Sequence, residues 1–270
     1  MKRTLTASLI AASLALGACS SSDDDDGILG IDNPIDDIED GIEDGIDDIT
    51  GEDDDDDDGD SDDADSATFQ VTFTNLSSQL LTPPVVAIHD SSIHLFQVGE
   101  ESSNAVQAIA EMGNNDPLVE FATDPDNAAL VSAAGVAGDG PFGPGNTVVT
   151  SLTSDQADHV FSAVNMVICT NDGIAGFDSI SLPEGTDPLT LVAVVYDAGT
   201  RQNQADAETF FPPPCRSGDV VEAPLEDPRQ PIAGHPGQTG LTSPTEGPAA
   251  GLSIDFAASQ QVLQVEIVRN

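Results

Sequence analysis

The chain has 270 residues, of which 49 are acidic and 6 basic, so its formal net charge at neutral pH is -43. A surface of that charge repels nucleic acid and anionic lipid headgroups, which excludes functions that depend on binding either of them. It attracts divalent cations instead, and we expect no nucleic-acid partner.

Residues 1–18 have the pattern of a bacterial lipoprotein signal peptide. A basic start precedes an apolar run at residues 5–16, and residues 16–19 read L-G-A-C, which matches a lipobox. The apolar run is too short to cross a bilayer comfortably. We expect cleavage before Cys19, lipid on its thiol and anchoring in the cell envelope. Ser20 stands where an Asp would be the usual inner-membrane signal, which favours the outer membrane or cell surface. The alternative is an ordinary signal peptide with a cysteine nearby.

Residues 19–66 form an acidic linker in this interpretation. Residues 23–65 carry 24 of the 49 acidic residues and no basic one. So few large apolar residues cannot offset the entropy cost of folding, and like charges extend the chain, so we expect disorder. Isoleucines recur every three or four residues, but glycines and Pro34 interrupt any helix they could form. A calcium-binding repeat is the alternative to a spacer, although the EF-hand spacing is absent.

Residues 67–270 are long enough for one hydrophobic core, and their pattern is mainly that of strands. Alternating or continuous apolar runs predict strands at residues 68–74, 85–88, 93–98, 146–152, 159–169, 189–195 and 261–268. Residues 103–112, capped by a serine, and residues 116–123 are predicted helices. Residues 124–146 read as loop, and residues 200–258 as a long proline-rich excursion. The expected fold class is mainly β, an antiparallel sandwich with a short helical insertion.

Two acidic turns end neighbouring apolar runs and suggest a site for a hard cation. Residues 170–178 read T-N-D-G-I-A-G-F-D, and residues 196–200 read Y-D-A-G-T. Calcium takes six to eight oxygen ligands from carboxylates, amides and backbone carbonyls, which such turns supply. The alternative is that these are ordinary turn aspartates.

Several motifs, taken in order, carry a family resemblance. They are F-Q-V-T-F-T-N-L at residues 69–76, P-P-V-V-A-I-H-D at 83–90, L-F-Q-V-G at 95–99, P-F-G-P-G at 141–145, the two acidic turns, and V-E-I-V-R at 265–269. Together they resemble the bacterial spondin-domain proteins, a family that includes the amino-terminal adhesive domain of animal F-spondin and mindin. The resemblance covers nearly all of residues 67–270. It implies a C2-like β-sandwich, a bound Ca²⁺, and binding or adhesion rather than catalysis.

The resemblance also implies a set of calcium ligands. Asp172 would supply a carboxylate and the peptide near Gly176 a carbonyl. A further ligand is expected from the loop before the long strand, where Asp155 and Asp158 are the candidates. Two more aspartates would complete the shell or cap backbone amides, namely Asp178 and Asp197. We expect the 155–158 loop to meet residues 170–178 at one end of the sandwich.

Two cysteines remain beyond Cys19. In an exported protein Cys169 and Cys215 most simply form one disulfide, and two buried free thiols are the alternative. A bridge would hold the long excursion against the end that carries residues 170–178, which is where we expect the binding surface.

Three functions are compatible with the sequence. The first is a lipid-anchored surface module, stabilised by calcium, that binds an extracellular glycan or protein. The second is an envelope hydrolase acting on polysaccharide or peptide. No nucleophile elbow or paired-carboxylate motif stands out, so we expect no enzyme. The third is a passive acidic envelope protein.

Overall fold

The computed structural model describes residues 66–203, 215, 225–226, 228–241, 243–245 and 247–270. The predicted signal peptide, Cys19 and the predicted acidic linker lie outside these described residues. Among the residues described, no helix is long and apolar enough to cross a membrane.

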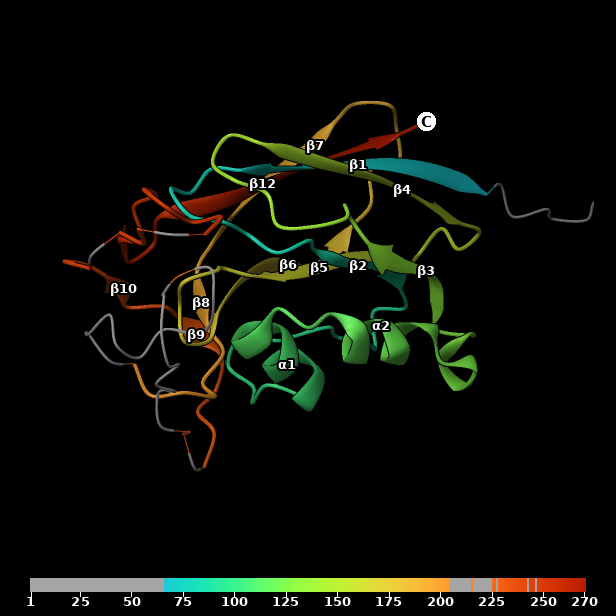
Figure 1. Cartoon of the computed structure of the whole chain (residues 1–270). Coiled ribbons are helices and arrows are strands. Elements are labelled where there is room, and N and C mark those ends of the chain that lie inside the picture. The colour runs from blue at the N-terminus through green and yellow to red at the C-terminus, as the bar shows by residue number, and fades with distance from the viewer. Residues whose placement is uncertain (1–65, 204–214, 216–224, 227, 242, 246) are drawn as a thin grey trace, which may run out of the picture. The chain divides into compact units, whose positions relative to one another are not determined.

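Two antiparallel sheets face each other and form a sandwich (Figure 1). The four-stranded sheet has the order β4 (Thr147–Ser154), β1 (Ala67–Asn75), β12 (Gln261–Arg269), β7 (Leu189–Val194). The six-stranded sheet has the order β3 (Val131–Val136), β2 (Val85–His89), β5 (Val160–Met166), β6 (Gly173–Ser181), β8 (Tyr196–Asp197), β9 (Ala233–Gly234). β10 (Gly237–Gln238) and β11 (Phe256–Ala257) pair separately. The predicted fold class, mainly β with antiparallel sheets, is confirmed.

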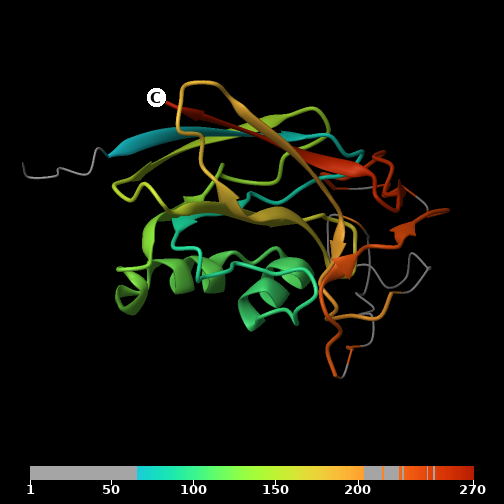
Figure 2. The ribbon, with the colours of Figure 1, turned by 180° about the vertical axis from the view of Figure 1, so that it is seen from behind.

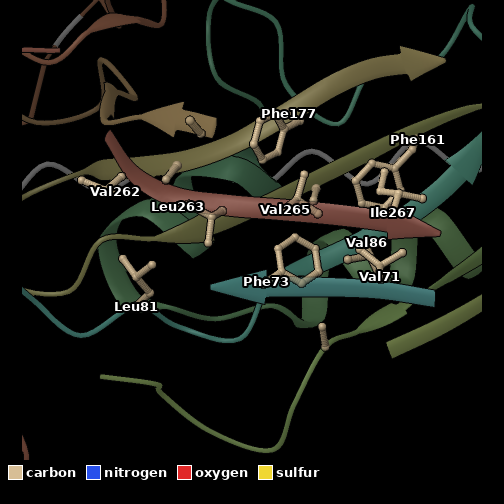
Figure 3. Packing of buried hydrophobic residues seen from close by; sticks show 14 of the residues in the cluster. Val71, Phe73, Leu81, Val86, Phe161, Phe177, Val262, Leu263, Val265 and Ile267 are labelled. Atoms are coloured by element: carbon tan, nitrogen blue, oxygen red, sulfur yellow. The ribbon is translucent and has the colours of Figure 1, made fainter. Parts of the chain in front are cut away.

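The main core lies between the two sheets (Figure 3). Strand alternation directs one set of side chains inward, so that Val71 and Phe73 of β1 lie beside Val265 and Ile267 of β12. Phe161 of β5 faces them from the other sheet, with its ring 6.5 Å from that of Phe73. These side chains are buried, so the sandwich is held mainly by the hydrophobic effect.

The helices cover the other face of the six-stranded sheet (Figures 1 and 2). They are α1 (Asn104–Met112), α2 (Asp116–Thr123) and the short 3-10 helix η1 (Pro125–Asn127). Ser103 caps α1 by accepting a hydrogen bond from the backbone of Val106, as predicted. A second core lies between α1 and the sheet, where Val106 and Ile109 are buried in the same cluster as Val164 and Ile174.

Three sequence predictions of local structure were wrong. Residues 93–98, predicted as a strand, form an irregular segment, in which consecutive residues Leu95 and Phe96 are both buried and the period of two is lost. Residues 131–136, predicted as loop, form the edge strand β3, whose small residues give a weak signal. The stretch 170–178, predicted as a loop, belongs mostly to β6, which begins at Gly173.

Candidate metal centre

The candidate site begins in the tight connection between β5 and β6. Thr170 organises this turn, because its hydroxyl donates to the carbonyl of Val167 at 2.7 Å and accepts from the amide of Gly173 at 2.8 Å. A Cβ on Gly173 would lie 2.6 Å from that hydroxyl oxygen, so no other residue fits there without a shift. Cys169 adopts a left-handed backbone, with φ of 73°. The turn therefore places Asp172 at the start of β6.

Asp172 is fully buried, and its two carboxylate oxygens have different surroundings. Oδ2 accepts from the backbone amides of Thr200 and Arg201, both at 2.8 Å, and from the Thr200 hydroxyl at 3.3 Å. Oδ1 is buried and has no hydrogen-bond partner among the described residues. A buried unpartnered carboxylate oxygen is costly, so Asp172 favours either a proton or a cation at that position.

The acidity of Asp172 reflects this environment. Burial and, to a smaller extent, the nearby Asp197 carboxylate together raise the pKa of Asp172 from 3.8 to about 7. The hydrogen bonds from Arg201 and Thr200 act in the opposite direction but are outweighed. The folded chain therefore holds a proton at Asp172 up to near-neutral pH unless another positive charge takes its place.

Asp197 lies opposite Gly173 in the short pairing of β6 with β8. Its Oδ1 accepts from the amide of Gly199 at 2.7 Å, and its Oδ2 contacts the side-chain amide of Asn203. Gly199 has φ of 68°, and a Cβ there would lie 2.0 Å from the carbonyl oxygen of Gln230. The glycine in the Y-D-A-G-T turn is thus required by close backbone packing.

A buried ion pair stands beside the site. Arg201 donates to Glu111 of α1 at 2.6 Å, and both side chains are at most 10% exposed. Because the amide of Arg201 also binds Asp172, this residue links the helix to the site. Sequence reasoning missed Glu111, Thr200 and Arg201. The rarity of basic residues, 6 in 270, is the signal that could have drawn attention to Arg201.

The disulfide between Cys169 and Cys215 is present, with an S–S distance of 2.01 Å. The carbonyl of Cys169 also accepts from the side chain of Gln238 at 3.0 Å. Both contacts tie the turn before Asp172 to residues far along the chain.

Gly176 allows β5 and β6 to approach each other closely. It pairs with Val164 in β5, beside the bulge between Phe161 and Ala163. A Cβ at Gly176 would lie 2.1 Å from the carbonyl oxygen of Ala163, closer than any side chain allows. Close strand approach therefore accounts for this glycine.

Asp155 and Asp158 do not join Asp172. They lie in the loop between β4 and β5, next to Val160, which pairs with Ser181 at the far end of β6. Asp172 lies at the opposite end of this hairpin, where Met166 pairs with Ile174. The expected meeting of the 155–158 loop with Asp172 was wrong, because that loop enters the long strand at its start and Asp172 follows the strand's end.

Asp178 has separate partners. Its Oδ2 accepts from Nδ1 of His94 at 2.6 Å, and its Oδ1 accepts from the amide of Leu95 at 3.1 Å and the hydroxyl of Ser162 at 3.2 Å. Ser162 lies 2.7 Å from Nε2 of His89. This serine and histidine are fully buried, so a substrate cannot reach the pair. The network fixes the 90–95 turn to β5 and β6.

Two surface hollows lie among the described residues, and Asp172 lines neither. A hollow of about 430 Å³ lies between the α1–α2 turn and residues 139–141, over Met166. Another, of about 340 Å³, is lined by Phe69, Leu182 and Arg269. Asp172 lines neither of these two hollows.

The carboxylate oxygens at this site suit one hard cation, but the side chains would supply only part of its coordination shell. Asp172 offers an unpartnered oxygen, and Asp197 is close enough to raise its pKa. The described residues hold no group of three or more His, Cys, Asp or Glu side chains suited to a metal ion. A calcium ion here would need backbone carbonyls or water for most of its six to eight ligands.

Comparison with known proteins gives one family. The family model for the spondin N-terminal domain (Spondin_N) matches residues 66–217. No curated protein matches the chain.

Proposed function

This chain belongs to the spondin N-terminal domain family, and we propose that it is a calcium-stabilised module that binds an extracellular glycan or protein. The family itself suggests an extracellular module of binding or adhesion type. The observation that carries the calcium part is the fully buried Asp172, whose Oδ1 has no partner among the described residues.

A cation at Asp172 would act on stability rather than on the ligand directly. Because Asp172 is fully buried, a macromolecule cannot contact its carboxylate. A cation would replace the proton that burial favours and offset the repulsion from Asp197. Thr200 and Arg201, which bind the other oxygen, would transmit that stabilisation to the 196–201 turn and, through Glu111, to α1.

The experiment for calcium is thermal unfolding of the full-length chain with calcium and with EDTA. We expect a higher Tm with calcium, by several degrees. An unchanged Tm would show that no structural calcium is bound. A matched control is Asp155→Asn, which removes a carboxylate at the other end of the β5–β6 hairpin and should leave the calcium effect intact.

The attachment to a membrane rests on the sequence of the first 19 residues. We propose that Cys19 carries lipid and holds the module at the outer membrane or cell surface, with residues 19–66 as spacer. Metabolic labelling with a fatty acid should mark the wild-type chain and not Cys19→Ala. Labelling of both proteins would refute the assignment.

A hydrolase is less well supported. The fully buried Ser162–His89 pair and the placement of Asp172 outside both hollows argue against an accessible catalytic group at these positions. The family is also a non-catalytic, binding-type family. Incubation with polysaccharides and peptides, followed by product analysis, should show binding without turnover.

A further inference from the structure

The hollow of about 430 Å³ beside the helices has both buried apolar and exposed acidic residues in its lining. It lies where α1 ends and α2 begins, and both helices pack on the six-stranded sheet (Figure 1). Met166 and Ile168 form its floor and are 2% and 5% exposed. Asp116 and Asp139 also line it, and both are exposed. None of the described lining residues is basic. One ligand could therefore place an apolar body and a positive charge here.

Four hydrogen-bond donors at the connection between α1 and α2 are used within the protein. The backbone amides of Gly113 and Asn114 donate to carbonyls of α1 and close its carboxyl end. The amide of Asp116 donates to Oδ1 of Asn114 at 3.1 Å. The side chain of Asn115 donates to the carbonyl of Pro83, also at 3.1 Å. These four donors are not available to a ligand.

Three acceptors at the hollow are free. Because the carbonyl of Pro83 can only accept, its bond to Asn115 identifies Nδ2 of that side chain and leaves Oδ1 as the other atom. This Oδ1 is shielded from solvent and has no hydrogen-bond partner among the described residues. Neither ion pair found in the described part of the chain involves Asp116 or Asp139. A ligand that donates hydrogen bonds would therefore complement the hollow.

The charges around the hollow favour a cation. α1 ends at Met112 with no basic residue in its last turn, so the partial negative charge of its carboxyl end is not neutralised within the helix. The amino end of α2 carries a partial positive charge, but Asp116 in its first turn offsets it. Residues 66–270 hold 25 acidic and 4 basic residues, so the wider field of the domain also attracts cations.

The lining distinguishes between kinds of cation. A metal ion would find two carboxylates above an apolar floor, and the described residues contain no group of three or more His, Cys, Asp or Glu suited to a metal. A quaternary ammonium has no N–H for Oδ1 of Asn115, and the described lining holds no aromatic ring for a cation–π contact. A primary ammonium has three donors, and an alkyl chain attached to it would contact Met112, Met166 and Ile168.

We propose that this hollow binds a primary ammonium group carried on a short, unbranched alkyl chain. The ammonium would donate to Oδ1 of Asn115 and to the carboxylates of Asp116 and Asp139, while the chain would lie on Met166 and Ile168. A free aliphatic amine and the lysine side chain of a protein both carry this group. The inference goes beyond the proposed function, because it stands whether or not the module binds calcium or a glycan.

The test is a titration of the full-length chain with n-alkylamines from ethylamine to pentylamine, followed by NMR of isotope-labelled methionine methyl groups. Salt at about 150 mM weakens binding of the amines to exposed carboxylates elsewhere. Met112 and Met166 line the hollow, whereas Met1 does not, so the spectrum separates the hollow from the acidic residues 23–65. We expect saturable shifts of Met112 and Met166. The affinity should rise about fourfold for each added methylene, which corresponds to about 0.8 kcal/mol.

Two variants and two analogues test the charge and the donors. Asp116→Asn/Asp139→Asn should weaken pentylamine binding about fivefold, the effect of losing two partly exposed charge pairs. The matched control, Glu120→Gln/Asp126→Asn, removes two exposed carboxylates of α2 and η1 that do not line the hollow and should bind like the wild type. Pentanol, which lacks the charge, and trimethylpentylammonium, which lacks N–H donors, should each bind more weakly than pentylamine.

Several results would overturn this inference. They are unshifted Met166 with every amine, equal binding by both variants, affinity independent of chain length, or pentanol binding as well as pentylamine. A tripeptide with a central lysine between glycines separates the two sources of the group. Shifts with the peptide as well as with pentylamine would identify protein lysines as ligands, and shifts with pentylamine alone would identify free amines. Failure to bind calcium or any glycan would contradict the proposed function and leave this inference standing.

Discussion

Replacing Asp172 by Asn tests the energetics of the site, because the change removes the ionisable group and keeps an oxygen for the amides of Thr200 and Arg201. A pKa of about 7 in the folded chain against 3.8 in the unfolded chain corresponds to about 4 kcal/mol, since each pKa unit is about 1.4 kcal/mol. The folded chain holds this proton more tightly than the unfolded chain. The stabilisation is therefore complete below pH 3.8 and is lost as the pH rises through about 7.

The assay is urea unfolding in EDTA from pH 4 to pH 8, followed by far-ultraviolet circular dichroism because the chain has no Trp and one Tyr. Between pH 4 and pH 8 the free energy of unfolding of the wild type should fall by up to about 4 kcal/mol more than that of Asp172→Asn. Groups that both proteins share titrate in the same way in each of them. Their contribution therefore disappears when the free energy of unfolding of one protein is subtracted from that of the other at each pH. Identical pH profiles would refute the account of Asp172 as a buried, proton-holding carboxylate.

The same two proteins can be compared by urea unfolding with calcium in place of EDTA. At pH 7.5 calcium should stabilise the wild type by more than 1 kcal/mol and should stabilise Asp172→Asn much less, because the variant lacks the carboxylate charge. An equal effect in both proteins would place the stabilising ions elsewhere, for example on the acidic residues 23–65.

Three further changes test the packing around the site, each by urea unfolding. Gly176→Ala should cost about 3 kcal/mol or more, because its Cβ would lie 2.1 Å from the carbonyl oxygen of Ala163, whereas the control Gly135→Ala meets nothing within 4 Å; similar costs for both would contradict the packing role. The double variant Cys169→Ser/Cys215→Ser should lose about 4 kcal/mol, from the loop entropy of a 46-residue separation, and a wild type unaffected by reductant would argue against the disulfide. Glu111→Gln should cost about 3 kcal/mol by removing the negative charge of the buried Glu111–Arg201 pair, and a cost below about 1 kcal/mol would show that the pair contributes little.

The sequence predicted most of the sandwich because its strands have a clear period or a long apolar run. β1 and β12 alternate, and β5 is buried throughout and largely apolar. β3 was not predicted because its sequence, V-S-A-A-G-V, contains no large residue. β6 was not predicted because its glycines resemble those of a turn. In β6 the glycine at 176 is a requirement of strand packing, which a single sequence cannot distinguish from a flexible loop.

The candidate site was predictable only in part. The acidic turns identified Asp172 and Asp197, which the β6–β8 pairing brings together. Asp155 and Asp158 were grouped with them through the family resemblance, and Asp178 because it closes the T-N-D-G-I-A-G-F-D stretch. The β5–β6 register and the bond to His94 place these three elsewhere. The contributions of Glu111 and Arg201 depend on how α1 packs against the sheet, which local patterns do not encode.

The central claim is that this chain binds an extracellular ligand and does not transform it. The most direct measurement is an array of neutral glycans, anionic glycans and matrix proteins, probed with the full-length chain in calcium and followed by mass analysis of each bound ligand. The account predicts saturable binding to at least one ligand, which is recovered unchanged. Conversion of a ligand to products, or the absence of binding to every ligand on the array, would contradict it.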